Sequence, residues 1–147
     1  MSNLPKRSHV EVLIEKMETA LNNDFYFEAV WLAYSLIEDR VDSALRKTTG
    51  GLTSSRALFG KKLDSLIQRI PNDSTLTLMK TAYNYDLLLQ KINVWKDSRN
   101  NLMHALANSV KPRVDLETEC QLIAREGYSL AREMLTRGYD LKNLLQR

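Results

Sequence analysis

The chain has 147 residues, one cysteine, two histidines and a formal net charge of +3. One cysteine excludes an internal disulfide framework, and one cysteine with two histidines cannot supply a closed zinc site. No apolar run is long enough to span a membrane, and the first residues lack a secretory signal pattern. We therefore expect a single cytoplasmic domain over residues 1–147 that holds neither a metal nor a cofactor.

Apolar residues recur at helical spacing along most of the chain, and no strand pattern competes with them. The spacing predicts a first helix over about residues 8–22, which Asn22-Asn23-Asp24 ends. A second helix is predicted over about residues 25–47, and Gly50-Gly51 stops it. A polar loop leads to a third helix over about residues 57–70.

The second half of the chain predicts two longer helices. The segment Pro71 to Ser74 predicts the end of one helix and an N-terminal cap for the next. A fourth helix is therefore expected from about Thr75 to Asn108, and the pattern is compatible with a kink near its end. A fifth helix is predicted over about residues 115–137, and Gly138 is expected to separate it from a short frayed helix. Short connections between such helices favour an all-α fold, an up-and-down bundle of about five helices.

The fourth predicted helix carries a charged residue within its apolar seam. In steps of three and four residues the seam runs through Tyr85, Leu88, Ile92, Trp95, Arg99, Leu102 and Leu106. A guanidinium in such a seam costs free energy unless it is paired or lies at an open site. Arg99, the polar Asn100 and then His104 form a pattern that suggests RNA chemistry. A salt bridge from Arg99 to Asp97, Glu38 or Asp39 and a half-buried His104 would account for the same residues structurally.

The motif Arg99-Asn100-x-x-x-His104, with Trp95 four residues before the arginine, resembles that of the HEPN superfamily. In that family an arginine is followed by four to six residues and a histidine, often with Asn, Asp or His directly after the arginine. The second predicted helix, with Glu38 and Asp39, is also similar to the family's acidic second helix. The resemblance covers about residues 8–137 and implies the HEPN-like helical fold.

The resemblance implies a metal-independent endoribonuclease, often the toxin of a toxin–antitoxin or phage-defence system. It also implies a homodimer that brings two motifs to one cleft. RNA carries its own nucleophile, the 2′-hydroxyl, and His104 would act as its general base. Arg99 would hold the phosphate, and Asn100 would orient His104 or contact the phosphate. Arg99 and His104 point apart on an ideal helix, so a dimer or a kink would be needed to bring them together.

Basic residues gather in segments 40–69 and 91–113, whereas acidic residues are in excess elsewhere. This distribution is a mild indication of a polyanionic partner such as RNA. The candidate phosphate contacts are Lys61, Lys62, Arg46, Lys47 and Lys96. Glu38 and Asp39 are interpreted as supporting partners of Arg99 in preference to metal ligands.

Five aromatic residues at helical spacing are interpreted as core in preference to base-stacking platforms, and Cys120 is interpreted as a small core residue. The five are Trp31, Tyr34, Tyr83, Tyr85 and Trp95. One HEPN subgroup carries, two residues after the histidine, a tyrosine that a partner nucleotidyltransferase modifies. Leu106 stands there in this chain, which argues against that regulation.

A different class of function fits the same resemblance. It is a non-catalytic HEPN-like module that binds a protein partner such as an antitoxin, a nucleotide or RNA. An open cleft that both Arg99–His104 pairs of a dimer face would favour the enzyme. An Arg99 that is buried and neutralised by Glu38 or Asp39 would favour the module.

Overall fold

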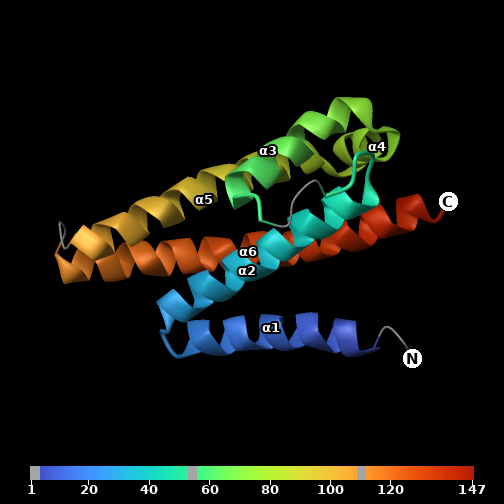
Figure 1. Cartoon of the computed structure of the whole chain (residues 1–147). Helices are drawn as coiled ribbons and strands as arrows, with labels where there is room; N and C mark the ends of the chain where they lie inside the picture. The colour runs from blue at the N-terminus through green and yellow to red at the C-terminus, as the bar shows by residue number, and fades with distance from the viewer. Residues whose placement is uncertain (1–3, 53–55, 109–111) are drawn as a thin grey trace. The chain divides into compact units, whose positions relative to one another are not determined.

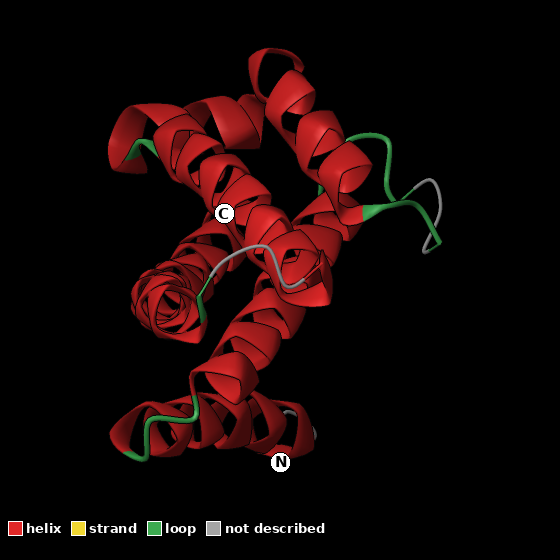
Figure 2. Ribbon diagram, turned by 90° about the vertical axis from the view of Figure 1, so that its left-hand side faces the viewer, coloured by secondary structure: helices red, strands yellow, loops and turns green. Residues whose placement is uncertain are grey.

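Helices form most of the chain in the computed structural model, which describes residues 4–52, 56–108 and 112–147 (Figure 1). They are α1 (Leu4–Asn22), α2 (Tyr26–Lys47), α3 (Phe59–Arg69), α4 (Ser74–Tyr83), α5 (Tyr85–Asn108) and α6 (Arg113–Leu145), with a short 3-10 turn η1 (Ile70–Asn72) between α3 and α4. Figure 2 shows helices joined by loops, and no strand occurs among the described residues. The predicted all-α class is confirmed. Over the same residues, no helix has the length and apolar character needed to cross a membrane.

The chain divides into two compact units, each of which is described by itself. Unit 1 comprises Met1–Leu36 and Trp95–Arg132, and unit 2 comprises Ile37–Val94 and Glu133–Arg147. Unit 1 therefore contains α1, the first half of α2, the second half of α5 and the longer part of α6. Arg99, Asn100 and His104 all lie in unit 1.

The first two helices end at the residues that the sequence indicates. Asp24, two residues after the end of α1, has a φ of 60°, a left-handed conformation that short polar side chains tolerate better than most. Gly50 and Gly51, after α2, have φ values of 102° and 62°. Such values favour glycine, because a Cβ would clash with the backbone there.

Asp73 provides the predicted cap at the start of α4. Its Oδ1 accepts a hydrogen bond from the Leu76 N–H at 3.0 Å, and its Oδ2 accepts one from the Thr49 N–H at 2.9 Å. Burial on its own would raise the pKa of this carboxyl. The hydrogen bonds from Thr49 and Leu76 favour the ionised form and outweigh burial, so the pKa lies below its ordinary value of 3.8. The same carboxylate thus caps α4 and holds the residues that follow α2.

Two predicted boundaries are wrong. The fourth helix does not run unbroken to Asn108, because α4 and α5 meet at Asn84, which has a φ of 54°. The Asn84 N–H donates to the Lys80 carbonyl at 3.0 Å and so closes α4. Gly138 does not end a helix either, since α6 continues to Leu145. A glycine inside a helix costs only about 1 kcal/mol relative to alanine, which neighbouring packing can offset.

The predicted apolar stripes are largely confirmed as core. Tyr85, Leu88, Ile92, Trp95 and Leu102 of the α5 seam are all buried, and so is Cys120 on α6. Burial raises the pKa of the Cys120 thiol to about 11, as expected of a thiol in apolar surroundings. Among the residues of α1 whose burial the structure describes, Val10, Met17, Ala20 and Leu21 are buried.

Candidate functional site

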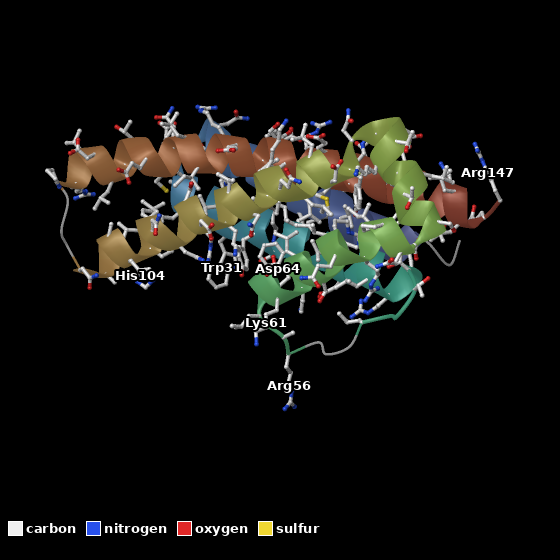
Figure 3. All side chains as sticks on the ribbon, turned by 90° about the horizontal axis from the view of Figure 1, so that it is seen from above. Trp31, Arg56, Lys61, Asp64, His104 and Arg147 are labelled. Carbon is white, nitrogen blue, oxygen red and sulfur yellow. The ribbon has the colours of Figure 1, made fainter. Side chains whose placement is uncertain are left out.

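The site is built on a tryptophan that fixes α5 against α6 within unit 1. Trp95 is fully buried, and its Nε1 donates a hydrogen bond to the Ile123 carbonyl at 2.8 Å. Its ring lies directly over Gly127, where the missing side chain leaves room for the close approach. In this part of the molecule α5 and α6 run side by side (Figures 1 and 3). Trp95 therefore sets the position of Arg99, which lies one turn further along α5.

Arg99 stacks on an aromatic ring and pairs with no carboxylate of the described residues. Its Cζ lies 4.0 Å from the centre of the Tyr34 ring, a close cation–π contact. Its Nη1 donates to Asn100 Oδ1 at 3.1 Å. Its Nε is buried without a hydrogen-bond partner among the described residues, whereas Nη2 is neither hydrogen-bonded there nor fully buried. Tyr34 thus holds the guanidinium through its ring, and no carboxylate among the described residues of unit 1 pairs with the charge.

His104 and Asn100 are both exposed on α5. His104 makes no hydrogen bond or ion pair with any described residue, and Figure 3 shows it near the end of α5. Helix α5 continues through the motif without interruption. Residues five apart on a helix differ by about 140° in direction and about 7.5 Å along the axis. Arg99 and His104 of one copy therefore face different directions.

Glu38 and Asp39 of α2 lie in unit 2 and have cationic partners there. Glu38 Oε2 lies 3.7 Å from Lys62 Nζ. Asp39 Oδ2 accepts hydrogen bonds from the neighbouring Arg40. The structure thus shows both carboxylates in local ion pairs of unit 2.

Lys62 differs from the solvated phosphate contact that the sequence suggests. It is only 5% exposed, and its Nζ lies 3.0 Å from Asp42 Oδ1. The sequence contains a signal for this, because Lys62 falls three residues after Phe59 and four before Leu66, both of which are buried on the same stripe. We therefore remove Lys62 from the candidate RNA contacts, and its neighbour Lys61 remains, exposed on α3 (Figure 3).

The other basic candidates are distributed over both units. Arg46 and Lys47 are exposed in the last turn of α2, in unit 2. Lys96 lies in unit 1, where its side chain is 17% exposed and its Nζ lies 3.4 Å from Asp97 Oδ1. Of the candidate phosphate contacts, Lys96 alone belongs to the same unit as Arg99.

The interpretation of all five aromatic residues as core is wrong for Trp31 and Tyr83. Tyr85 and Trp95 are buried, but Trp31 on α2 is 67% exposed and Tyr83 is 37% exposed. Trp31 follows Val30, a fully buried residue, and so points about 100° away from the buried stripe of α2. Trp31 is therefore an exposed residue, as a base-stacking platform has to be.

Comparisons with known proteins identify no relative. No family model matches the chain, and neither a curated protein nor a solved structure matches it. Over the described residues, no three His, Cys, Asp or Glu side chains gather as potential metal ligands.

Proposed function

We propose that the protein is a metal-independent endoribonuclease of the HEPN type that acts as a homodimer, in a toxin or phage-defence role. The observation that supports this best is the state of Arg99. Its guanidinium is held on the Tyr34 ring, it has no carboxylate partner among the described residues, and Nη2 is not fully buried. A structural arginine in an apolar seam would be expected to have an ionic partner.

The proposed chemistry needs two kinds of group. Arg99 would bind the scissile phosphate and stabilise the negative charge that grows on its oxygens. His104 would remove the proton from the 2′-hydroxyl, whose oxygen then attacks the adjacent phosphorus. The 5′-oxygen leaves with a proton from a second acid, and the products are a 2′,3′-cyclic phosphate and a 5′-hydroxyl. His104 of a second copy is the acid that we propose.

Helix geometry supports the use of two copies. Because α5 is unbroken, Arg99 and His104 of one chain are directed apart, and neither is fully buried. Two-fold pairing would allow Arg99 of one copy and His104 of the other to face the same phosphate. Asn100 shares a face with His104 and accepts from Arg99, so it would connect the two groups.

The first experiment measures RNA cleavage by purified protein in the presence of a chelator. Wild type should cut single-stranded RNA and leave cyclic-phosphate ends. Arg99→Ala and His104→Ala should each lose activity by at least about 100-fold, the usual scale for an acid–base or charge-stabilising group. His9→Ala is the matched control, because His9 is the other histidine and is exposed on α1. Cleavage that survives both substitutions, or that needs a divalent metal, would contradict the mechanism.

A second experiment tests the pairing of two copies. Arg99→Ala and His104→Ala are mixed under conditions that allow subunits to exchange. A mixed dimer retains one Arg99 and one His104 that can face the same phosphate, but it lacks the second His104 that would protonate the leaving group. The mixture should therefore recover only part of the activity that each variant lacks. No recovery, or a monomer by light scattering at micromolar concentration, would contradict the two-copy site. RNA binding without cleavage by wild type would instead support a non-catalytic module.

A further inference from the structure

We propose that Trp31 is a stacking platform for a nucleobase of the RNA whose phosphate is held at Arg99. The proposal rests on the ribonuclease function proposed above and assigns one residue that selects the unpaired state of the RNA. Single-stranded nucleic acids are commonly held by aromatic side chains on which bases stack, since every base has a flat π-face.

Exposure is the first argument. Trp31 is 67% exposed, whereas Trp95, the other tryptophan, is fully buried. Phe27, four residues before Trp31 on the same face of α2, is 46% exposed. Leaving two large aromatic side chains in water forgoes the stabilisation that burial would give, and such patches are often binding sites.

The position of Trp31 relative to Arg99 is the second argument. Trp31 lies three residues before Tyr34 on α2, a separation of about 4.5 Å along the helix. The Arg99 guanidinium lies over the Tyr34 ring. The exposed indole of Trp31 therefore lies about one helical turn from Tyr34, the residue whose ring contacts the Arg99 guanidinium. Figure 3 shows Trp31 and His104 on the same side of unit 1.

The charges around Trp31 favour a base over a phosphate at this position. Glu28, three residues before Trp31, is an exposed carboxylate and would repel a phosphate. Stacking of a neutral base on the indole is not opposed in this way. An apolar protein surface laid over Trp31 would remove Glu28 and Arg99 from water without giving either a partner, which is costly. A nucleotide, with a flat base next to an anionic phosphate, matches both the indole and Arg99.

Tryptophan fluorescence offers a direct test, because Trp31 is the only exposed one of the two tryptophans. The His104→Ala variant, which should leave RNA intact, is titrated with a short single-stranded RNA. A matched oligomer with the same phosphates but abasic sugars is the second probe. The RNA should quench the fluorescence, and the abasic oligomer should not. In the His104→Ala/Trp31→Phe variant the quenching should disappear, since Trp95 is buried.

Affinity and cleavage give the second readout. Trp31→Ala should weaken binding of single-stranded RNA by about 5- to 100-fold and raise KM, and Trp31→Phe should recover most of the loss. Leu122→Ala is the matched control, because Leu122 is 65% exposed on α6 of the same unit. It should leave affinity and KM unchanged. Equal affinities of wild type and Trp31→Ala for RNA would overturn the proposal.

The outcomes separate this proposal from the ribonuclease function. If wild type cuts RNA and Trp31→Ala cuts it with unchanged KM, the platform is wrong and the ribonuclease stands. If wild type does not cut but RNA still quenches Trp31 and the abasic oligomer does not, the ribonuclease is wrong and base stacking stands. If no RNA binds even at low salt, both are wrong, and binding of a protein to the Trp31 surface becomes the better explanation.

Discussion

The indole ring of Trp95 occupies the space that a side chain at position 127 would need. A Cβ built on Gly127 would lie 2.6 Å from Trp95 Cζ2 and 3.1 Å from the Cβ of Ala33. Both neighbours are fully buried, so neither can move without disturbing the core of unit 1. Gly127 is therefore a packing requirement of the helix pair that carries the motif.

We expect Gly127→Ala to destabilise the protein by about 1–3 kcal/mol, because overpacking outweighs the gain in helix propensity. Gly138→Ala is the matched control on the same helix. There a Cβ would meet nothing closer than Arg40 Cδ at 4.0 Å. That substitution should stabilise the protein by about 0.5–1 kcal/mol. Denaturant unfolding of the three proteins checks both signs, and equal stabilities of the two variants would contradict the packing argument.

The neighbouring lysines of α3 should behave differently when each is replaced by methionine. Lys62→Met leaves the Asp42 carboxylate, which is 17% exposed, without its cation, and we expect a loss of about 3 kcal/mol. Lys61→Met removes an exposed charge and should change stability by less than about 0.5 kcal/mol. Adding Asp42→Asn to Lys62→Met should restore part of the stability. Urea unfolding at neutral pH is the measurement, and equal effects at both positions would argue against the buried ion pair.

The Asp73 carboxylate should make stability depend on pH at the acidic end. Its pKa in the folded protein lies below the ordinary value of 3.8, so its contribution is complete above that value and is lost as the pH falls through the folded pKa. Asp73→Ala should cost about 2 kcal/mol near neutrality, since a helix cap and the bond from Thr49 are both removed. The difference between wild type and variant should shrink below pH 3.8. A difference that stays constant down to strongly acidic pH would show that the charge does not contribute.

RNA affinity should respond to Lys61 through the phosphates alone. Each phosphate contact to single-stranded nucleic acid contributes a slope of about −0.7 to the plot of log affinity against log salt concentration. Lys61→Glu should weaken binding and flatten that slope by about one contact, with the cleavage rate at saturating RNA unchanged. Lys142→Glu on α6, also an exposed position of unit 2, is the control. Equal slopes for wild type and Lys61→Glu would mean that Lys61 is ordinary surface.

The all-α class and most of the core residues could be predicted from the sequence, because both follow from the spacing of apolar residues. The apolar residues of the seam from Tyr85 to Leu102 are buried as expected. The break at Asn84 could not be predicted in the same way, since asparagine is compatible with helical and left-handed conformations alike. The prediction that a helix ends at Gly138 is wrong for the opposite reason. A glycine permits a left-handed helix end without requiring one, and here the helix simply continues.

The candidate site could be predicted only in part. The motif residues Arg99, Asn100 and His104 can be read from the sequence, but the Tyr34 ring beneath Arg99 comes from another helix and has no local signal. Hydropathy also treats Trp31 and Trp95 alike, although one is exposed and the other buried. The exposure of each tryptophan depends on its position relative to the buried stripe of its helix. Charge composition likewise could not separate Lys61 from Lys62.

The positions of the boundaries between the two units decide whether one unit could be produced without the other. Domain boundaries usually fall in exposed linkers, where one cut frees a piece that folds alone. Here every boundary falls inside a helix, within α2, α5 and α6. Removing either unit would sever three backbone hydrogen-bond ladders and leave each with unsatisfied ends. We therefore expect neither unit to fold when it is produced without the other.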